Sequence, residues 1–105
     1  MPNQIIQLYE YHVWANRRVF EHLRKLPEDL WTKDMISVFP SVCSLMSHIY
    51  AMDTMWFSVM RERPFDEART LVMRLIEESK MESLEGMEKR FMETEAEYKD
   101  FFDYV

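Results

Sequence analysis

Apolar residues recur at steps of three and four over most of this chain, the spacing that places them on one face of an α-helix. The pattern predicts four helices, at residues 3–25, 41–62, 66–80 and 83–105. Pro27, Pro40 and Pro64 stand in the intervals, where a proline ring blocks continuation of a helix. We therefore predict an all-α fold, in a single domain that covers residues 1–105.

The predicted helices differ in the regularity of their apolar stripes. In the last helix the stripe runs through Leu84, Met87, Phe91, Thr94, Tyr98, Phe101 and Val105. In the first it runs through Ile5, Leu8, His12, Ala15, Val19 and Leu23. These stripes are wide and rich in aromatic residues, so we expect apolar surface that a further helix or another chain covers. The connection at residues 32–40 is expected to tuck Met35, Ile36, Val38 and Phe39 under itself.

The second predicted helix carries the residue on which the functional interpretation depends. Its stripe is predicted at Leu45, Ile49, Met52, Trp56 and Val59. His48, three residues after Leu45 and four before Met52, lies at the margin of this stripe. A lone histidine in such a place is more often a boundary residue of the core than a metal ligand or an acid–base group. Spacing alone leaves its role open.

Composition narrows the function classes. The net charge of −6 and the single glycine oppose a nucleic-acid-binding surface and a glycine-rich phosphate loop, respectively. One cysteine cannot form an internal disulfide, and no apolar run is long enough for a signal sequence or a membrane span. We therefore expect a cytoplasmic protein with no nucleic-acid or membrane partner. The ten methionines are expected to fill the core rather than to bind copper.

Few other side chains offer chemistry by their spacing. His12 and His22 are about 15 Å apart along one helix and cannot share an ion, and His22 is expected to face solvent. Asp53 lies about 140° around the helix from His48, so it is not a natural co-ligand, whereas His12 could approach His48 from the first helix. Cys43, in a first helical turn without a nearby base, is predicted to be buried and inert.

Several short motifs together resemble a known family. These are the segment Tyr9-Glu-Tyr-His-Val-Trp-Ala-Asn-Arg-Arg-Val-Phe20, the sequence Leu26-Pro27-Glu28, the helix entry Phe39-Pro40-Ser41, and His48-Ile49 followed by Asp53 and Trp56. In this combination, residues 5–60 resemble the N-terminal half of the DinB/YfiT-like family. The resemblance implies an up-down four-helix bundle, often dimeric, that holds zinc, nickel or manganese through three histidines.

The same resemblance assigns His48 as the metal ligand from the second helix. The family's other two ligands form a His-x-x-x-His pair on its final helix, which this sequence does not contain. Residues 83–105 are the third long helix of the sequence, and residues 66–80 are a short one. The chain is thus expected to be a partial domain that lacks the family's last helix and is inactive by itself.

Related proteins imply a metal-dependent hydrolase or thiol S-transferase with a small-molecule or thiol substrate, and leave the catalytic residues unknown. The alternative is a non-catalytic helical module that dimerises through Leu84, Phe91, Tyr98, Phe101 and Phe102.

Overall fold

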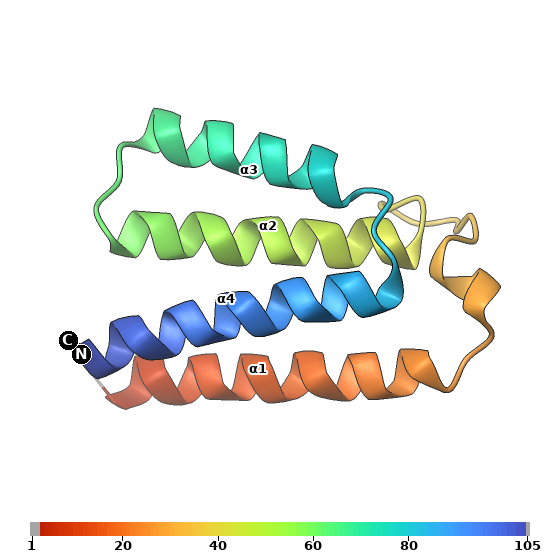
Figure 1. Ribbon diagram of the computed structural model, residues 1–105, viewed down its shortest axis with the longest axis horizontal. Helices are drawn as coiled ribbons and strands as arrows, with labels where there is room; N and C mark the ends of the chain where they lie inside the picture. The colour runs from red at the N-terminus through yellow and green to blue at the C-terminus, as the bar shows by residue number, and fades with distance from the viewer. Residues whose placement is uncertain (1–2, 105) are drawn as a thin grey trace.

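The computed structural model describes the backbone of residues 3–104 and confirms the all-α prediction (Figure 1). Its elements are α1 (Asn3–Arg24), the short 3-10 helix η1 (Glu28–Trp31), α2 (Val42–Met60), α3 (Phe65–Ser79) and α4 (Leu84–Tyr104). All four predicted helices are present, with bounds within two residues of those expected wherever both ends are described. The predicted stripe residue Val105 lies outside the described residues.

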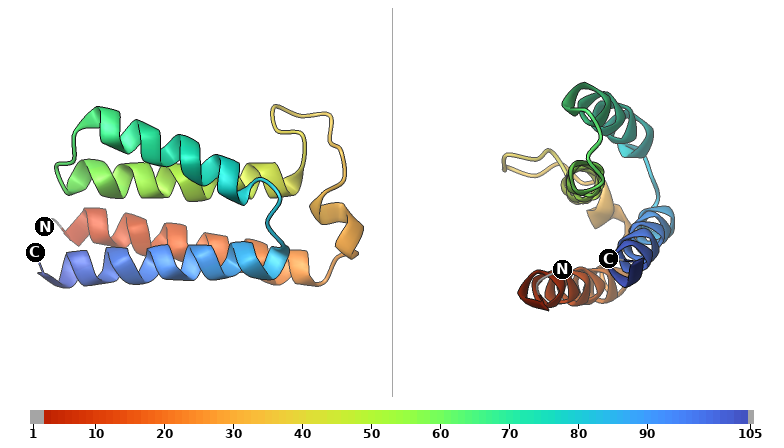
Figure 2. Two further views of the ribbon diagram at one scale, coloured as in Figure 1. Left: turned by 45° about the horizontal axis from the view of Figure 1, so that its top comes forward. Right: turned by 90° about the vertical axis from the view of Figure 1, so that its left-hand side faces the viewer.

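Successive helices run up and down, so that α2 and α4 point in the same direction (Figure 1). Seen end-on, the helices form a curved array in the order α3, α2, α4, α1 (Figure 2). Accordingly, α2 packs on both α3 and α4, and α1 packs chiefly on α4. One side of α1 and of α2 therefore has no helix against it in the described part of the chain.

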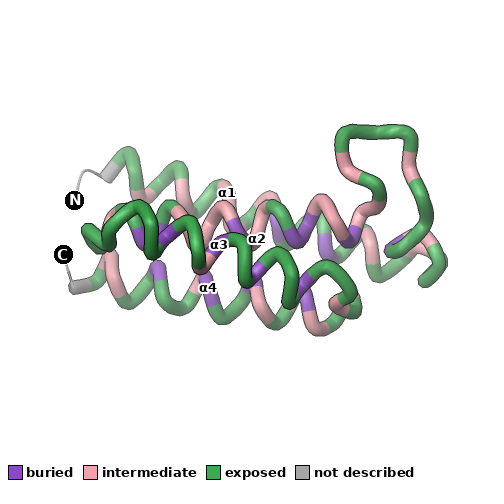
Figure 3. Tube along the Cα trace, turned by 90° about the horizontal axis from the view of Figure 1, so that it is seen from above, coloured by how far each residue is buried: buried purple, intermediate pink, exposed green. Residues whose placement is uncertain are grey.

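The stripe predicted for α4 is confirmed as the centre of the core. Met87, Phe91, Thr94 and Tyr98 are all buried there. The ring of Phe91 meets that of Phe20 of α1 edge-on, with 5.0 Å between centroids. Buried positions accordingly line the sides where the helices meet (Figure 3). This helix has one clear apolar face because most of the positions outside the stripe are charged.

The stripe predicted for α2 is wrong as a description of its buried face. Trp56 and Val59 are exposed, and the buried residues are Cys43, Met46, Ser47, Ala51, Phe57 and Ser58. Small side chains on this face allow α3 to approach closely, and the hydroxyls of Ser47 and Ser79 hydrogen-bond across the contact. Burial of small polar residues is invisible to an apolar-periodicity pattern, which instead picked out the uncovered side of the helix.

The stripe predicted for α1 is displaced in the same way. Ile5, Leu8 and Val19 are exposed, whereas Asn16 and Phe20 are buried toward α4. Helix α1 thus has two apolar sides, one packed on α4 and one uncovered. The uncovered side of α1 and that of α2 are together called the α1/α2 face below, and its most exposed apolar residues are Leu8, Val19, Trp56 and Val59.

The connection between α1 and α2 differs from expectation in part. Ile36 and Val38 are almost fully exposed rather than tucked under the loop, and only Met35 and Phe39 are partly buried. Trp31 of η1 is the residue of this connection that packs into the core. It is buried, and its indole Nε1 donates to the carbonyl of Glu82 at 2.8 Å. Ser41 caps α2 as its position suggests, because its hydroxyl accepts from the amide of Ser44.

Two methionines of α4 form a matched test of this core. Met87 is fully buried, whereas Met92 has 59% of its surface exposed. Because Met87→Ala leaves a cavity, it should lower the free energy of unfolding by about 2–5 kcal/mol. Met92→Ala should change it by less than about 0.5 kcal/mol. Urea denaturation of both variants measures this, and equal losses would contradict the burial assigned to α4.

Candidate functional site

His48, the ligand expected from the family resemblance, is an exposed side chain on α2. Its ring lies 5.0 Å from that of Phe39, centroid to centroid, so the connecting loop flanks it on one side. Within residues 4–103, no group of three or more histidine, cysteine, aspartate or glutamate side chains is placed to hold a metal ion. His48 is therefore accessible to a metal, but these residues do not surround it with a set of three ligands.

The structure brings together a different pair, His12 of α1 and Asp53 of α2. The imidazole Nε2 lies 3.0 and 2.9 Å from the two carboxylate oxygens of Asp53. The side-chain amide nitrogen of Asn16, one helical turn after His12, lies 3.2 Å from the same nitrogen. Thus His12 approaches α2, as spacing allowed, but its contact there is Asp53.

Sequence reasoning missed this pair because it weighed Asp53 only as a partner of His48 on the same helix. The two acidic oxygens face α1, on the side of α2 turned away from His48. A signal was present in the spacing of His12 and Asn16, which puts two polar side chains on one turn of an otherwise apolar face. Polar groups in such a place need a partner, and that partner comes from a neighbouring helix.

Helix α4 fixes the position of the pair. The Tyr98 hydroxyl donates to the backbone carbonyl of Asp53 at 2.6 Å. The Tyr98 ring stacks on that of Tyr9, one turn before His12, with centroids 4.2 Å apart. Tyr98 thus touches both the helix that carries the acid and the helix that carries the imidazole. Burial, followed by the nearby charge of Asp53, raises the pKa of both tyrosine hydroxyls well above the ordinary value.

The carboxylate also changes the protonation of His12. Its hydrogen bond with Asp53 raises the pKa of the imidazole above the usual 6.5, against the opposing effect of partial burial. A pKa that is higher in the folded than in the unfolded chain means that the fold favours the protonated ring. The resulting stabilisation is fully present below about pH 6.5 and is lost as the pH rises through the folded-state pKa.

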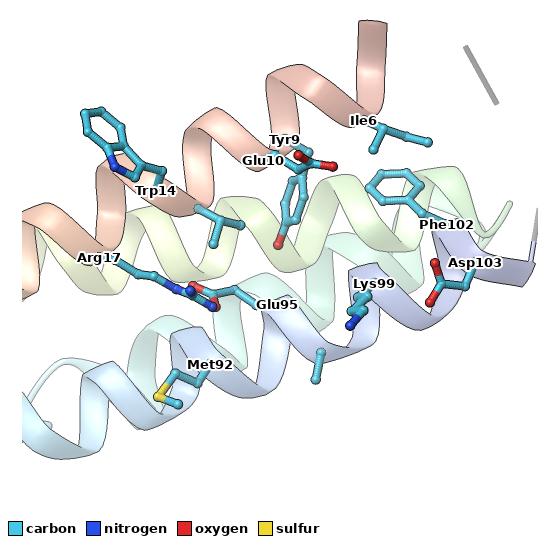
Figure 4. Close-up of a pocket in the computed structure, with 12 residues that line it drawn as sticks. Ile6, Tyr9, Glu10, Trp14, Arg17, Met92, Glu95, Lys99, Phe102 and Asp103 are labelled. Carbon is cyan, nitrogen blue, oxygen red and sulfur yellow. The ribbon is translucent and has the colours of Figure 1, made fainter. Parts of the chain in front are cut away.

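A cavity of about 590 Å³ lies between α1 and α4, and Tyr9, which stacks on Tyr98, forms part of its wall (Figure 4). Its walls include Tyr9, Trp14 and Phe102, and Lys99 and Asp103 stand at its α4 side. Glu95, also in the wall, accepts a hydrogen bond from Arg17 at 3.0 Å. None of the described residues that line the cavity is a histidine or a cysteine, so they offer apolar contact and charged groups but no nucleophile or metal ligand of those types.

The remaining predicted residues behave as expected. His22 is exposed on α1. Cys43 is buried, and its thiol lies 3.4 Å from the Glu82 carbonyl, to which it can donate. Burial raises the pKa of this thiol, which keeps it protonated and unreactive. Among the described helices, none combines the length and hydrophobicity that crossing a membrane requires.

Comparison with known proteins gives one consistent result. The family model described as the DinB family matches residues 1–105. The chain is 34% identical over 98 residues to Protein DinB of Bacillus subtilis (strain 168). The aligned region covers 93% of this chain and 57% of that protein. This chain thus spans little more than half the length of that relative. No solved structure matches it significantly.

Proposed function

The chain belongs to the DinB family, and from this membership we propose that it contributes one wall of a divalent-metal site in a hydrolase or thiol S-transferase. The proposed ligand is His48. The observation that carries the proposal is the exposure of its imidazole on α2, the helix that also exposes Trp56 and Val59 on its uncovered side. Of the three metals that the family resemblance implies, zinc and nickel suit an imidazole ligand better than manganese, which prefers oxygen ligands.

One ligand does not make a tight site, because catalytic zinc centres use three protein ligands. Among the described residues, no three such side chains gather at one place, so His48 is proposed as one contributor to a larger ligand set. The family pattern supplies the others as a His-x-x-x-His pair on a helix that this sequence does not include. Once bound, the metal would polarise a thiol or a carbonyl group.

Metal content tests this proposal. The protein produced from the complete gene should contain about one divalent ion per chain, and His48→Ala should lose it, whereas His22→Ala should retain it. The 105-residue chain should bind zinc weakly or not at all in equilibrium dialysis, because it lacks two ligands. Elemental analysis of the purified proteins measures the ion. An unchanged metal content in His48→Ala would contradict the assignment.

A non-catalytic dimerisation module is the second candidate, and the exposure of the α1/α2 face favours it. Leu8 and Trp56 have 71% and 56% of their surfaces exposed. The surface first expected for a dimer, on α4, is not available, because Phe91 and Tyr98 are buried within the chain. A homodimer would therefore use the α1/α2 face.

Light scattering over a range of concentrations tests the module. The chain should be dimeric, and Trp56→Gln should shift it toward monomer because that substitution removes a large apolar side chain from the interface. Trp14→Gln is the matched control, since Trp14 is equally exposed but lines the cavity between α1 and α4. A chain that is well folded and monomeric at every concentration contradicts this candidate.

A further inference from the structure

We propose that His12 and Asp53 form a proton-transfer dyad on the α1/α2 face, with His12 as the base and Asp53 as its positioning residue. The inference rests on the proposed function, because the proton would come from the nucleophile of that same site. It assigns a role to two residues that contribute no metal ligand.

The geometry selects one tautomer of the neutral ring. A carboxylate has no proton to donate, so its two contacts at 3.0 and 2.9 Å call for a hydrogen on Nε2. These two contacts are shorter than the 3.2 Å approach of the Asn16 amide nitrogen, which can only donate, so we assign the hydrogen to Nε2. His12 is therefore protonated at Nε2, and the lone pair of the neutral ring is on Nδ1. Within the described residues, no side-chain hydrogen bond involves Nδ1 of His12. The ring thus keeps its basic nitrogen free for a reacting group.

The surroundings suit a base better than a purely structural ion pair. The His12 side chain retains 39% of its exposure, so solvent and small molecules reach the ring. In the described part of the chain Asp53 makes no ion pair with lysine or arginine, which leaves its charge directed at His12. The other groups that face the ring are Asn16 and Tyr9 on its own helix, and Glu95 of α4, whose charge further favours the protonated form.

The dyad is also placed beside the surface on which a substrate would lie. On α2, His48 and Asp53 are about 140° apart around the helix, and the partly buried Met52 and the exposed Trp56 lie in the arc between them. An apolar substrate on that arc would have His48 on one side and His12 on the other. This arrangement places a base opposite the proposed ligand.

The step transfers one proton and balances. The nucleophile, the O–H of water or the S–H of a thiol, gives its proton to Nδ1 while its electron pair bonds to a carbonyl carbon and the C=O π pair moves onto the carbonyl oxygen. That pair then re-forms the C=O bond as the bond to the leaving group breaks, and the leaving group departs with the bonding pair and takes the proton from Nδ1. His12 returns to the neutral Nε2–H form, and Asp53 stays ionised throughout.

The protonation state can be read directly from the ¹⁵N-labelled chain, by two-bond ¹H–¹⁵N correlation during a pH titration. Neutral His12 should be protonated at Nε2 and bare at Nδ1, and its titration midpoint should lie above the ordinary histidine value of 6.5. Asp53→Asn should lower the midpoint. A neutral ring protonated at Nδ1, or an unchanged midpoint in Asp53→Asn, would overturn the dyad. The tautomer of the unmodified chain decides the matter even if that variant unfolds.

Hydrolysis of p-nitrophenyl acetate with EDTA present measures the base itself. His12→Gln should lower the rate about tenfold, less than the roughly 10²–10⁴-fold typical of a complete site. His22→Gln should leave it unchanged. The rate of the unmodified chain should rise with pH through the His12 midpoint and fall in D₂O, because the proton moves in the rate-limiting step.

Equal rates for the unmodified chain and His12→Gln would overturn the proposal. Acetylation of His12 together with an unchanged rate in D₂O would also overturn it, because that result shows that the imidazole attacks the ester directly. Neither readout uses a metal, so loss of the metal function leaves these results intact. Conversely, a failure of the dyad proposal would not change the outcome expected for the metal test, in which His48→Ala loses the ion.

Discussion

The burial of the apolar stripe of α4 between α1 and α2 is the constraint on which the rest of the structure depends. Phe91 packs on α1 through Phe20, and Tyr98 holds α2 through the carbonyl of Asp53. Helix α1 makes its main helix contact with α4, so this stripe determines where α1 lies relative to α2. The pairing of His12 with Asp53 follows from that placement.

The sequence predicts the position of each helix well, but it predicts which face of the helix is buried in α4 and not in α2. In α4 the charged positions leave only one apolar face, so Met87, Phe91 and Tyr98 could be assigned to the core without a structure. In α2, apolar residues occur on two sides, and the side that packs on α3 contains Ser47 and Ala51. Periodicity measures the apolar character of a face, not which neighbour it meets, so it placed Trp56 in the core when that residue is exposed.

The candidate site shows the same division. His48 was found through family resemblance, since a single exposed histidine carries no distinctive spacing. Neither residue spacing nor family resemblance predicts the contact of His12 with Asp53. Those residues are 41 positions apart, and their helices are not joined by a short turn. Such a contact depends on how α4 spaces its two neighbours. The stripes that periodicity predicts for α1 and α2 contain exposed residues and border this pair.

The central claim is that α4 brings His12 and Asp53 into a charge-coupled pair across two helices. A double-mutant cycle with His12→Gln and Asp53→Asn, followed by urea denaturation, measures that coupling. Because the pKa of His12 is raised in the fold, a coupling of about 0.2–1 kcal/mol is expected below roughly pH 6, with loss of its ionic part once the imidazole is neutral. Single effects that simply add at both low and high pH would contradict the account.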